Sequence, residues 1–165
     1  MTIEQVRAQL RNVPNFPKEG IQFKDITTVL KNSEMLKWLK DEIVSLYRDK
    51  GITKVVGLES RGFILGPAIA MELGAGFVPE RKPGKLPAEC ISVAYNKEYG
   101  TDRMEIHKDA LNAEDVVLIH DDLLATGGTA AGAVKLVRQL GVKKYMLIAL
   151  SNWMNWEVER FLTRT

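Results

Sequence analysis

The sequence has very little cysteine, no long apolar run and almost no excess charge. Cys90 is the only cysteine, so a disulfide within the chain is impossible and we expect a reducing compartment. No segment approaches the ~20 consecutive apolar residues of a membrane-spanning helix. Residues 1–11 alternate polar and apolar side chains and lack the apolar run of a signal peptide. We therefore expect a soluble, cytoplasmic protein that does not act at a membrane.

The near balance of charge also excludes some classes of partner. There are 23 basic and 21 acidic residues, which leaves a formal net charge of +2. A nucleic-acid-binding protein usually carries a strongly basic face, so we expect no nucleic acid partner. Only two histidines are present, and no histidine and cysteine pattern suggests a metal cage. No base accompanies Cys90 in a nucleophile signature, so we interpret it as a packed side chain.

What is present indicates a single domain. The 165 residues contain 45% hydrophobic and 27% charged side chains, as in ordinary globular proteins. No repeat, low-complexity tract or linker divides them. We expect one domain over 1–165, made of an N-terminal segment to about residue 35, a core over about 36–150 and a tail over 151–165.

Capping and periodicity predict two helices near the N-terminus. Thr2 and Gln5 have the spacing of a capping box, which predicts a helix that runs to about Arg11. Pro14 and Pro17 end it and begin an irregular segment. A second helix is predicted between Ser33 and Gly51. One face of that helix is predicted to carry the apolar side chains of Leu36, Leu39, Ile43 and Leu46.

From residue 54 onward, short apolar runs alternate with helical segments. Strands are predicted at 54–59, 76–80, 90–95, 102–106, 116–121 and 145–150, and helices at 63–73 and 129–140. The 81–89 stretch, rich in proline and basic residues, is predicted to be a mobile loop. Strands that are almost continuously apolar favour an α/β fold with a parallel sheet covered by helices on both faces. Ligands of such sheets bind at the carboxyl ends of the strands, where two glycine-rich turns occur here.

The second of these turns has the composition of a phosphate site. Ala125, Thr126, Gly127, Gly128 and Thr129 follow a strand and open a helix. Glycines let the backbone approach a ligand, and the free amides of a helix start can bind an anion. The turn is not a Walker A loop, because no Gly-Lys-Ser/Thr follows, and its glycines lack the dinucleotide spacing.

The two acids before this turn restrict the chemical class of ligand that the turn can bind. Asp121 and Asp122 would repel a phosphate unless they face hydroxyl donors or a metal ion. A 5-phosphorylated ribose satisfies both requirements, since its hydroxyls donate to the acids while its phosphate lies in the turn. The pattern therefore predicts a sugar phosphate ligand.

The segment VLIHDDLLATGGT at 117–129 resembles the PRPP-binding motif of type I phosphoribosyltransferases (PRPP is phosphoribosyl pyrophosphate), and most of all that of the adenine-specific members. Further similar segments occur in the family's order: PNFPKEGIQFKDIT, GLESRGFILGPAIA, PERKPGKLP and AYNKEYG. The resemblance covers roughly residues 12–148. It implies a parallel sheet flanked by helices, with a small N-terminal hood, and transfer of a phosphoribosyl group to adenine to give AMP and pyrophosphate in purine salvage.

The resemblance also implies roles for individual residues. It assigns the ribose to the acid pair and the 5-phosphate to 125–129, in agreement with the chemistry above. The pyrophosphate is assigned to Glu59, Ser60, Arg61, Arg81, Lys82 and Lys85. Among these, the cations would neutralise the leaving group. Glu98 would exchange a proton with the purine, and Tyr99 would close over the site or support its loop.

Recognition of the base is assigned by resemblance to the hood. Phe23 and Leu123 would stack on the two faces of adenine, while the backbone groups of Gln22 and Lys24 would read its edge. Hypoxanthine would leave these groups unpaired, and such mismatches discriminate strongly. Mg²⁺ is implied as the cofactor, held mainly by the substrate rather than by a dedicated cage. A homodimer is also implied.

Two features depart from the family pattern. His120 stands where a small apolar residue is usual, and we interpret it as a neutral, hydrogen-bonded side chain, with tuning of the acid pair as the alternative. His107 is interpreted as a surface residue. The tail over 151–165 is divergent, and its Trp153, Trp156 and Phe161 have the spacing of an amphipathic helix.

Two other functions remain open from the sequence. One is a phosphoribosyltransferase for another base, against which the hood and AYNKEYG segments argue. The other is a non-catalytic regulator that senses PRPP or a nucleotide, against which Glu98 and the near-neutral charge argue.

Overall fold

The computed structural model describes residues 1–97, 100–122 and 128–150. Within the chain, contacts define two compact units, Met1–Leu46 and Tyr47–Thr165. The helix predicted after Ser33 belongs with the first unit, although the sequence had suggested a boundary near residue 35. None of the described helices is both long enough and apolar enough to cross a membrane.

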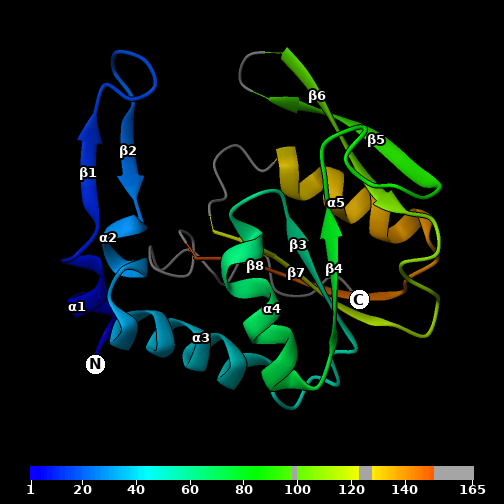
Figure 1. The fold of residues 1–165 in the computed structure, drawn as a ribbon, viewed down its shortest axis with the longest axis horizontal. Coiled ribbons are helices and arrows are strands. Elements are labelled where there is room, and N and C mark those ends of the chain that lie inside the picture. The colour runs from blue at the N-terminus through cyan, green and yellow to red at the C-terminus, as the bar shows by residue number, and fades with distance from the viewer. Residues whose placement is uncertain (98–99, 123–127, 151–165) are drawn as a thin grey trace. The chain divides into compact units, whose positions relative to one another are not determined.

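The first unit holds a short helix, a β-hairpin and two further helices (Figure 1). Helix α1 (Ile3–Arg7) starts at the predicted capping box, in which Thr2 accepts from the Gln5 N–H. It ends earlier than expected, because residues from Arg11 onward form strand β1 (Arg11–Pro14), which pairs antiparallel with β2 (Gln22–Asp25). The segment predicted to be irregular is thus half of a hairpin, followed by α2 (Thr27–Leu30).

Helix α3 (Ser33–Tyr47) confirms the second predicted helix. Leu39 and Ile43 are buried as expected. Leu46 is exposed, and Val44 and Tyr47 are buried instead. A helix of 3.6 residues per turn moves the buried stripe from position 43 to 47 rather than to 46, which explains the difference.

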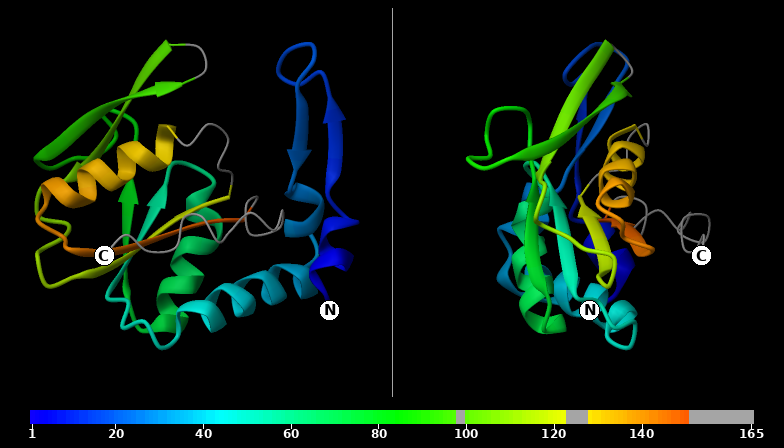
Figure 2. Two further views of the ribbon diagram at one scale, coloured as in Figure 1. Left: turned by 180° about the vertical axis from the view of Figure 1, so that it is seen from behind. Right: turned by 90° about the vertical axis from the view of Figure 1, so that its right-hand side faces the viewer.

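The second unit is built on the predicted parallel sheet. Its strands lie in the order β4–β3–β7–β8, and all neighbouring pairs are parallel. The bounds are β3 (Lys54–Leu58), β4 (Gly76–Glu80), β7 (Val116–Asp121) and β8 (Lys144–Ala149). Two helices, α4 (Gly62–Leu73) and α5 (Gly128–Gln139), lie on opposite sides of this sheet (Figure 2). The fold class predicted from the sequence is confirmed.

The two strands predicted at 90–95 and 102–106 form a separate antiparallel hairpin. Strands β5 (Cys90–Lys97) and β6 (Gly100–His107) are longer than predicted and remain paired up to Lys97 and Gly100. The hairpin packs on α5, and Gly132 allows the close approach. A Cβ atom at Gly132 would lie 2.9 Å from Met104 Sδ and 3.3 Å from Tyr95 Cβ.

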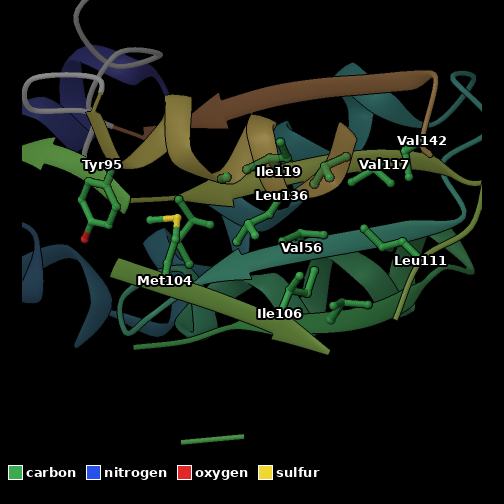
Figure 3. Packing of buried hydrophobic residues seen from close by; sticks show 13 residues of the cluster. Val56, Tyr95, Met104, Ile106, Leu111, Val117, Ile119, Leu136 and Val142 are labelled. Carbon is green, nitrogen blue, oxygen red and sulfur yellow. The ribbon is translucent and has the colours of Figure 1, made fainter. Parts of the chain in front are cut away.

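The main core of this unit lies between the sheet, α5 and the hairpin (Figure 3). Alternation along the strands directs Val56, Leu58, Val78 and Ile119 to this side. They meet Met104 of the hairpin and, from α5, Ala133, Leu136 and Val137. The opposite side of the sheet is covered by α4, where Phe77 packs edge-on against Phe63 with ring centroids 5.9 Å apart.

Glu80 and His120 are ionisable side chains that are almost fully buried near the carboxyl end of the sheet. Glu80 is 1% exposed and His120 is 0% exposed, and neither makes a side-chain hydrogen bond of normal geometry within the described residues. Burial, and then the charge of Asp121, raises the pKa of Glu80 to about 8. Burial lowers the pKa of His120 to about 4, against a smaller opposing effect of the Ile148 backbone. The low pKa keeps His120 neutral, as expected, and its polar contact is with the Ile148 backbone.

The raised pKa of Glu80 predicts a stability that falls as pH rises. Between the ordinary value of 4.5 and about 8, the folded chain retains a proton that the unfolded chain has lost. Each such proton costs up to about 1.4 kcal/mol of unfolding free energy per pH unit. Glu80→Gln should remove this dependence, so the wild type should lose more stability than the variant between pH 5 and pH 8 in urea titrations. Equal slopes for the two proteins would contradict the burial of Glu80, and Glu89→Gln, at an exposed position, is the control.

Candidate functional site

The predicted site residues fall on three parts of the described chain. They lie at the carboxyl ends of β3, β4 and β7, at the start of α5, and on the N-terminal hairpin. Several predicted residues lie outside the described residues: Glu98, Tyr99, Leu123, Ala125, Thr126, Gly127 and the tail over 151–165. Their assignments stay predictions.

The acid pair lies where strand β7 ends. Asp121 is its last residue, and the backbone N–H of Asp122 donates to Asp121 Oδ1 over 2.8 Å. Asp122 is only 6% exposed. Burial raises the pKa of Asp121, the neighbouring charge of Asp122 raises it further, and Arg61 opposes these effects. The two carboxyls are thus partly desolvated acceptors at the end of a buried strand.

Arg61 joins the turn after β3 to this acid pair. Its Nε lies 3.2 Å from Asp122 Oδ2, although the sequence had assigned Arg61 to pyrophosphate and the acids to ribose. The turn can approach β7 because its next residue is Gly62, where a Cβ atom would lie 2.5 Å from the His120 carbonyl oxygen. The Glu59–Ser60 peptide in this turn is cis. Two segments with separate predicted roles are therefore in direct contact.

The start of α5 is the described part of the predicted phosphate turn. Gly128 is the first residue of this helix, and both Gly128 and Thr129 are partly exposed. The first N–H groups of a helix have no partner within the helix and carry partial positive charge. This end can therefore attract an anion, as the sequence predicted.

The basic segment after β4 is tied to the end of β3 by Glu59. Arg81 donates through Nε to Glu59 Oε2 over 3.2 Å and through Nη2 to Oε1 over 3.3 Å. The Lys82 N–H donates to Glu59 Oε2 over 2.9 Å, and Lys85 Nζ lies 3.8 Å from Oε1. The structure thus brings together four of the residues predicted to bind pyrophosphate, with the carboxylate of one surrounded by donors of the other three.

Strand β6 holds the same segment from the other side. The backbones of Arg81 and Glu105 exchange two hydrogen bonds, of 2.9 and 2.7 Å, and the Gly84 N–H donates to Glu105 Oε2. Lys82 Nζ lies 3.9 Å from Asp102 Oδ2, and Asp102 also accepts from the Tyr95 hydroxyl. The basic segment therefore lies between the sheet and the hairpin of β5 and β6.

Sequence reasoning missed three acids of this region. Asp102 and Glu105 gave no signal, because only the pairing of β6 with residue 81 brings them near the basic segment. Glu80 could have been found, because alternation along GFVPE places it on the same face as the buried Val78.

In the first unit, the residues predicted to recognise adenine lie together on β2. Phe23 pairs with Val13 across the hairpin and packs edge-on against Phe16, with ring centroids 5.2 Å apart. Gln22 and Lys24 are exposed, and the Gln22 side chain accepts a hydrogen bond from Asn12. The hairpin therefore presents one partly exposed aromatic ring between two exposed polar positions.

Comparison with known proteins identifies close relatives. No model of a protein family matches the chain. The chain is 58% identical over 147 residues to the adenine phosphoribosyltransferase of Phocaeicola vulgatus, covering 89% of this chain and 84% of that protein. It is 60% identical over 144 residues to that of Bacteroides fragilis, covering 87% and 81%.

Solved structures of similar proteins agree with these relatives. Adenine phosphoribosyltransferase from Thermoanaerobacter pseudethanolicus aligns with a TM-score of 0.87 and 46% identity, covering 90% of this chain and 87% of that one. The enzyme from Giardia lamblia, complexed with 9-deazaadenine, aligns with a TM-score of 0.86 and 42% identity, covering 90% and 84%.

The contact at Gly62 predicts the effect of a single added methyl group. In Gly62→Ala the new Cβ would collide with a backbone carbonyl, which cannot rotate away, so the turn must move from β7. We expect a loss of about 1–3 kcal/mol in the free energy of unfolding, measured by urea titration. Gly20→Ala, at a glycine with open space around it but a positive φ, is the comparison for backbone strain alone. A Gly62→Ala protein as stable as the wild type would contradict the close packing.

Proposed function

Because the chain belongs to the adenine phosphoribosyltransferase family and is thus a pentosyltransferase, we propose that it transfers the 5-phosphoribosyl group of PRPP to adenine. The products are AMP and pyrophosphate, and the reaction depends on Mg²⁺. The observation that most supports this proposal is the contact between Arg61 and Asp122. It joins a turn suited to a diphosphate with an acid pair suited to sugar hydroxyls, and these two groups are neighbours in one PRPP molecule.

The described residues suit the sugar phosphate half of PRPP. Asp121 and Asp122 are acceptors for the ribose 2- and 3-hydroxyls, whose O–H groups would compensate their desolvation. The start of α5 at Gly128 and Thr129 binds the 5-phosphate together with 125–127. The acceptors for the ribose hydroxyls and the donors for the 5-phosphate thus follow one another along the chain.

The reaction forms one bond and breaks another at the same carbon. The ring nitrogen of adenine bonds to C1 of the ribose, the bond from C1 to the pyrophosphate oxygen breaks, and its electron pair leaves with pyrophosphate. Positive charge develops on the sugar, and Arg61 and the cations over 81–85 stabilise the departing anion. Glu98 takes up the proton that the purine ring loses as this bond forms, and Tyr99 closes over the site or supports its loop.

Adenine is selected by the N-terminal hairpin in this proposal. Phe23 and Leu123 stack on the base, and the backbone groups of Gln22 and Lys24 read its edge. A base that carries oxygen in place of the exocyclic amine would leave a backbone carbonyl facing another acceptor.

In this proposal, the magnesium ion is held mainly by its substrate. Among residues 1–97, 100–122 and 128–150, no group of three histidine, cysteine, aspartate or glutamate side chains is placed to hold a metal. Mg²⁺ commonly keeps several waters and binds through substrate phosphates. Bound to PRPP, the ion would neutralise part of the charge of the leaving pyrophosphate.

The homodimer and the cytoplasmic location also stay predictions.

The function is tested by supplying the purified protein with PRPP, Mg²⁺ and one nucleobase at a time. We expect nucleotide and pyrophosphate to form with adenine and not with hypoxanthine, guanine, xanthine or a pyrimidine. Glu98→Ala should lower turnover by about 10²–10⁴-fold, the usual contribution of a general acid or base, while PRPP binding is retained. Preference for another base would overturn the adenine assignment. Binding of PRPP without conversion of any base would favour the regulator.

Glu89→Ala is the matched control for this variant. Glu89 lies outside the predicted site, and its side chain is exposed and pairs only at the surface with Lys108 in the part of the chain that is described. Its loss should leave turnover unchanged. A comparable loss of turnover in both variants would remove the support for proton transfer by Glu98.

A further inference from the structure

The donors around Glu59 form a set that also suits a diphosphate. A guanidinium contributes two N–H groups, a backbone contributes one, and an ammonium lies within ion-pair distance. Planar guanidinium pairs, backbone amides and lysine are the groups that proteins use for phosphate oxygens. In this structure, the carboxylate of Glu59 lies at the centre of that set of donors.

The charge state of Glu59 is compatible with this position. Burial by itself raises the pKa of Glu59, but the Lys82 N–H, the Arg81 hydrogen bonds and the charges of Arg81 and Lys85 outweigh it. The pKa is therefore lowered and the side chain is an anion at neutral pH. An anion in this place cannot itself attract pyrophosphate, although the sequence had grouped Glu59 with the pyrophosphate ligands.

Contacts beyond the ion pair with Glu59 also fix the position of the Arg81 side chain. Its Nη1 donates to the Lys85 carbonyl over 3.3 Å, and its guanidinium carbon lies 6.0 Å from the centre of the Phe63 ring. The backbone of Arg81 is paired with Glu105 of β6. The cation is thus held close to the turn after β3, and a bound diphosphate would meet it in the company of the Glu59 carboxylate.

We propose that Glu59 is a positioning residue that competes with pyrophosphate for the cations of the 81–85 segment. It holds them in place before PRPP binds and regains them after transfer, which promotes the release of pyrophosphate. This inference rests on the proposed function, since it takes pyrophosphate to be the leaving group. It assigns to Glu59 an effect on product release rather than a contact with the product.

The proposal predicts that removing the Glu59 carboxylate strengthens, rather than weakens, the binding of pyrophosphate. Glu59→Gln keeps the size of the side chain but no longer neutralises the cations, so inorganic pyrophosphate should bind more tightly. We expect a dissociation constant about tenfold lower, as for the gain of one charge-assisted contact. Isothermal titration with pyrophosphate and Mg²⁺ measures it. A purely structural role of Glu59 predicts the opposite, because a loosened basic segment would bind pyrophosphate less well.

Glu105→Gln is the matched control. Glu105 also holds the 81–85 segment, but its side chain accepts from the Gly84 backbone N–H. Its substitution removes a nearby negative charge and should leave pyrophosphate affinity unchanged or weaker. If both variants bind pyrophosphate more tightly by the same factor, the effect is one of general electrostatics and the proposal is overturned. Unchanged or weaker pyrophosphate binding by Glu59→Gln would also overturn it, provided that circular dichroism shows the variant to be folded.

The wild-type protein separates this inference from the proposed function. If it converts adenine to AMP while Glu59→Gln shows no tightening, the competition fails and the enzyme assignment stands. If the wild type neither binds pyrophosphate nor converts a base, the proposed function fails and the inference fails with it.

Discussion

The carboxyl end of the parallel sheet depends on one close approach, that of the turn after β3 to the last residues of β7. Gly62 makes it possible, because any side chain there would meet the His120 carbonyl. Once the turn is in place, Arg61 reaches Asp122, and Glu59 lies where the basic segment after β4 can pair with it. Three strand ends that are far apart in the sequence are thereby connected through charged side chains.

This end of the sheet also concentrates desolvated acids. Glu80, Asp121 and Asp122 are all mostly removed from water, and the first two have raised pKa values. Isolated carboxylates are expensive to bury, so such groups stay protonated or wait for a partner. Arg61 supplies part of that compensation for Asp122. In the proposed function, the hydroxyl groups of the bound sugar would supply more.

The sequence was most informative where one physical rule governs a segment. Strands β4 and β7 have the bounds that their apolar runs predicted, and α4 and α5 begin and end within about one residue of expectation. The N-terminal hairpin was missed because prolines at 14 and 17 suggested a break, whereas Pro14 is the last residue of β1 and Pro17 lies in the loop that joins the two paired strands. Pairing partners far apart in the chain leave no local signal in composition.

The residues of the candidate site differ in how far the sequence alone could place them. Asp121, Asp122 and Arg61 were singled out because they lie at or just after the ends of buried strands, and the structure brings Arg61 and Asp122 into contact. The pairing of Glu59 with Arg81 was not predictable, because it depends on the register of β3 with β4. The buried states of Glu80 and His120 likewise depend on packing from several elements.

The register of β4 has a consequence for how this chain can tolerate insertions and deletions. Glu80 faces the core and Arg81 follows it at the strand end, so a shift of one residue would direct an acid outward and a guanidinium inward. Length changes within β4 should therefore be excluded during evolution. Residues 86 and 87 follow the last contact with Glu59 and precede the hydrogen bonds that join Ala88 and Glu89 to His107 and Lys108, so a change of length there would leave both the register and these bonds in place.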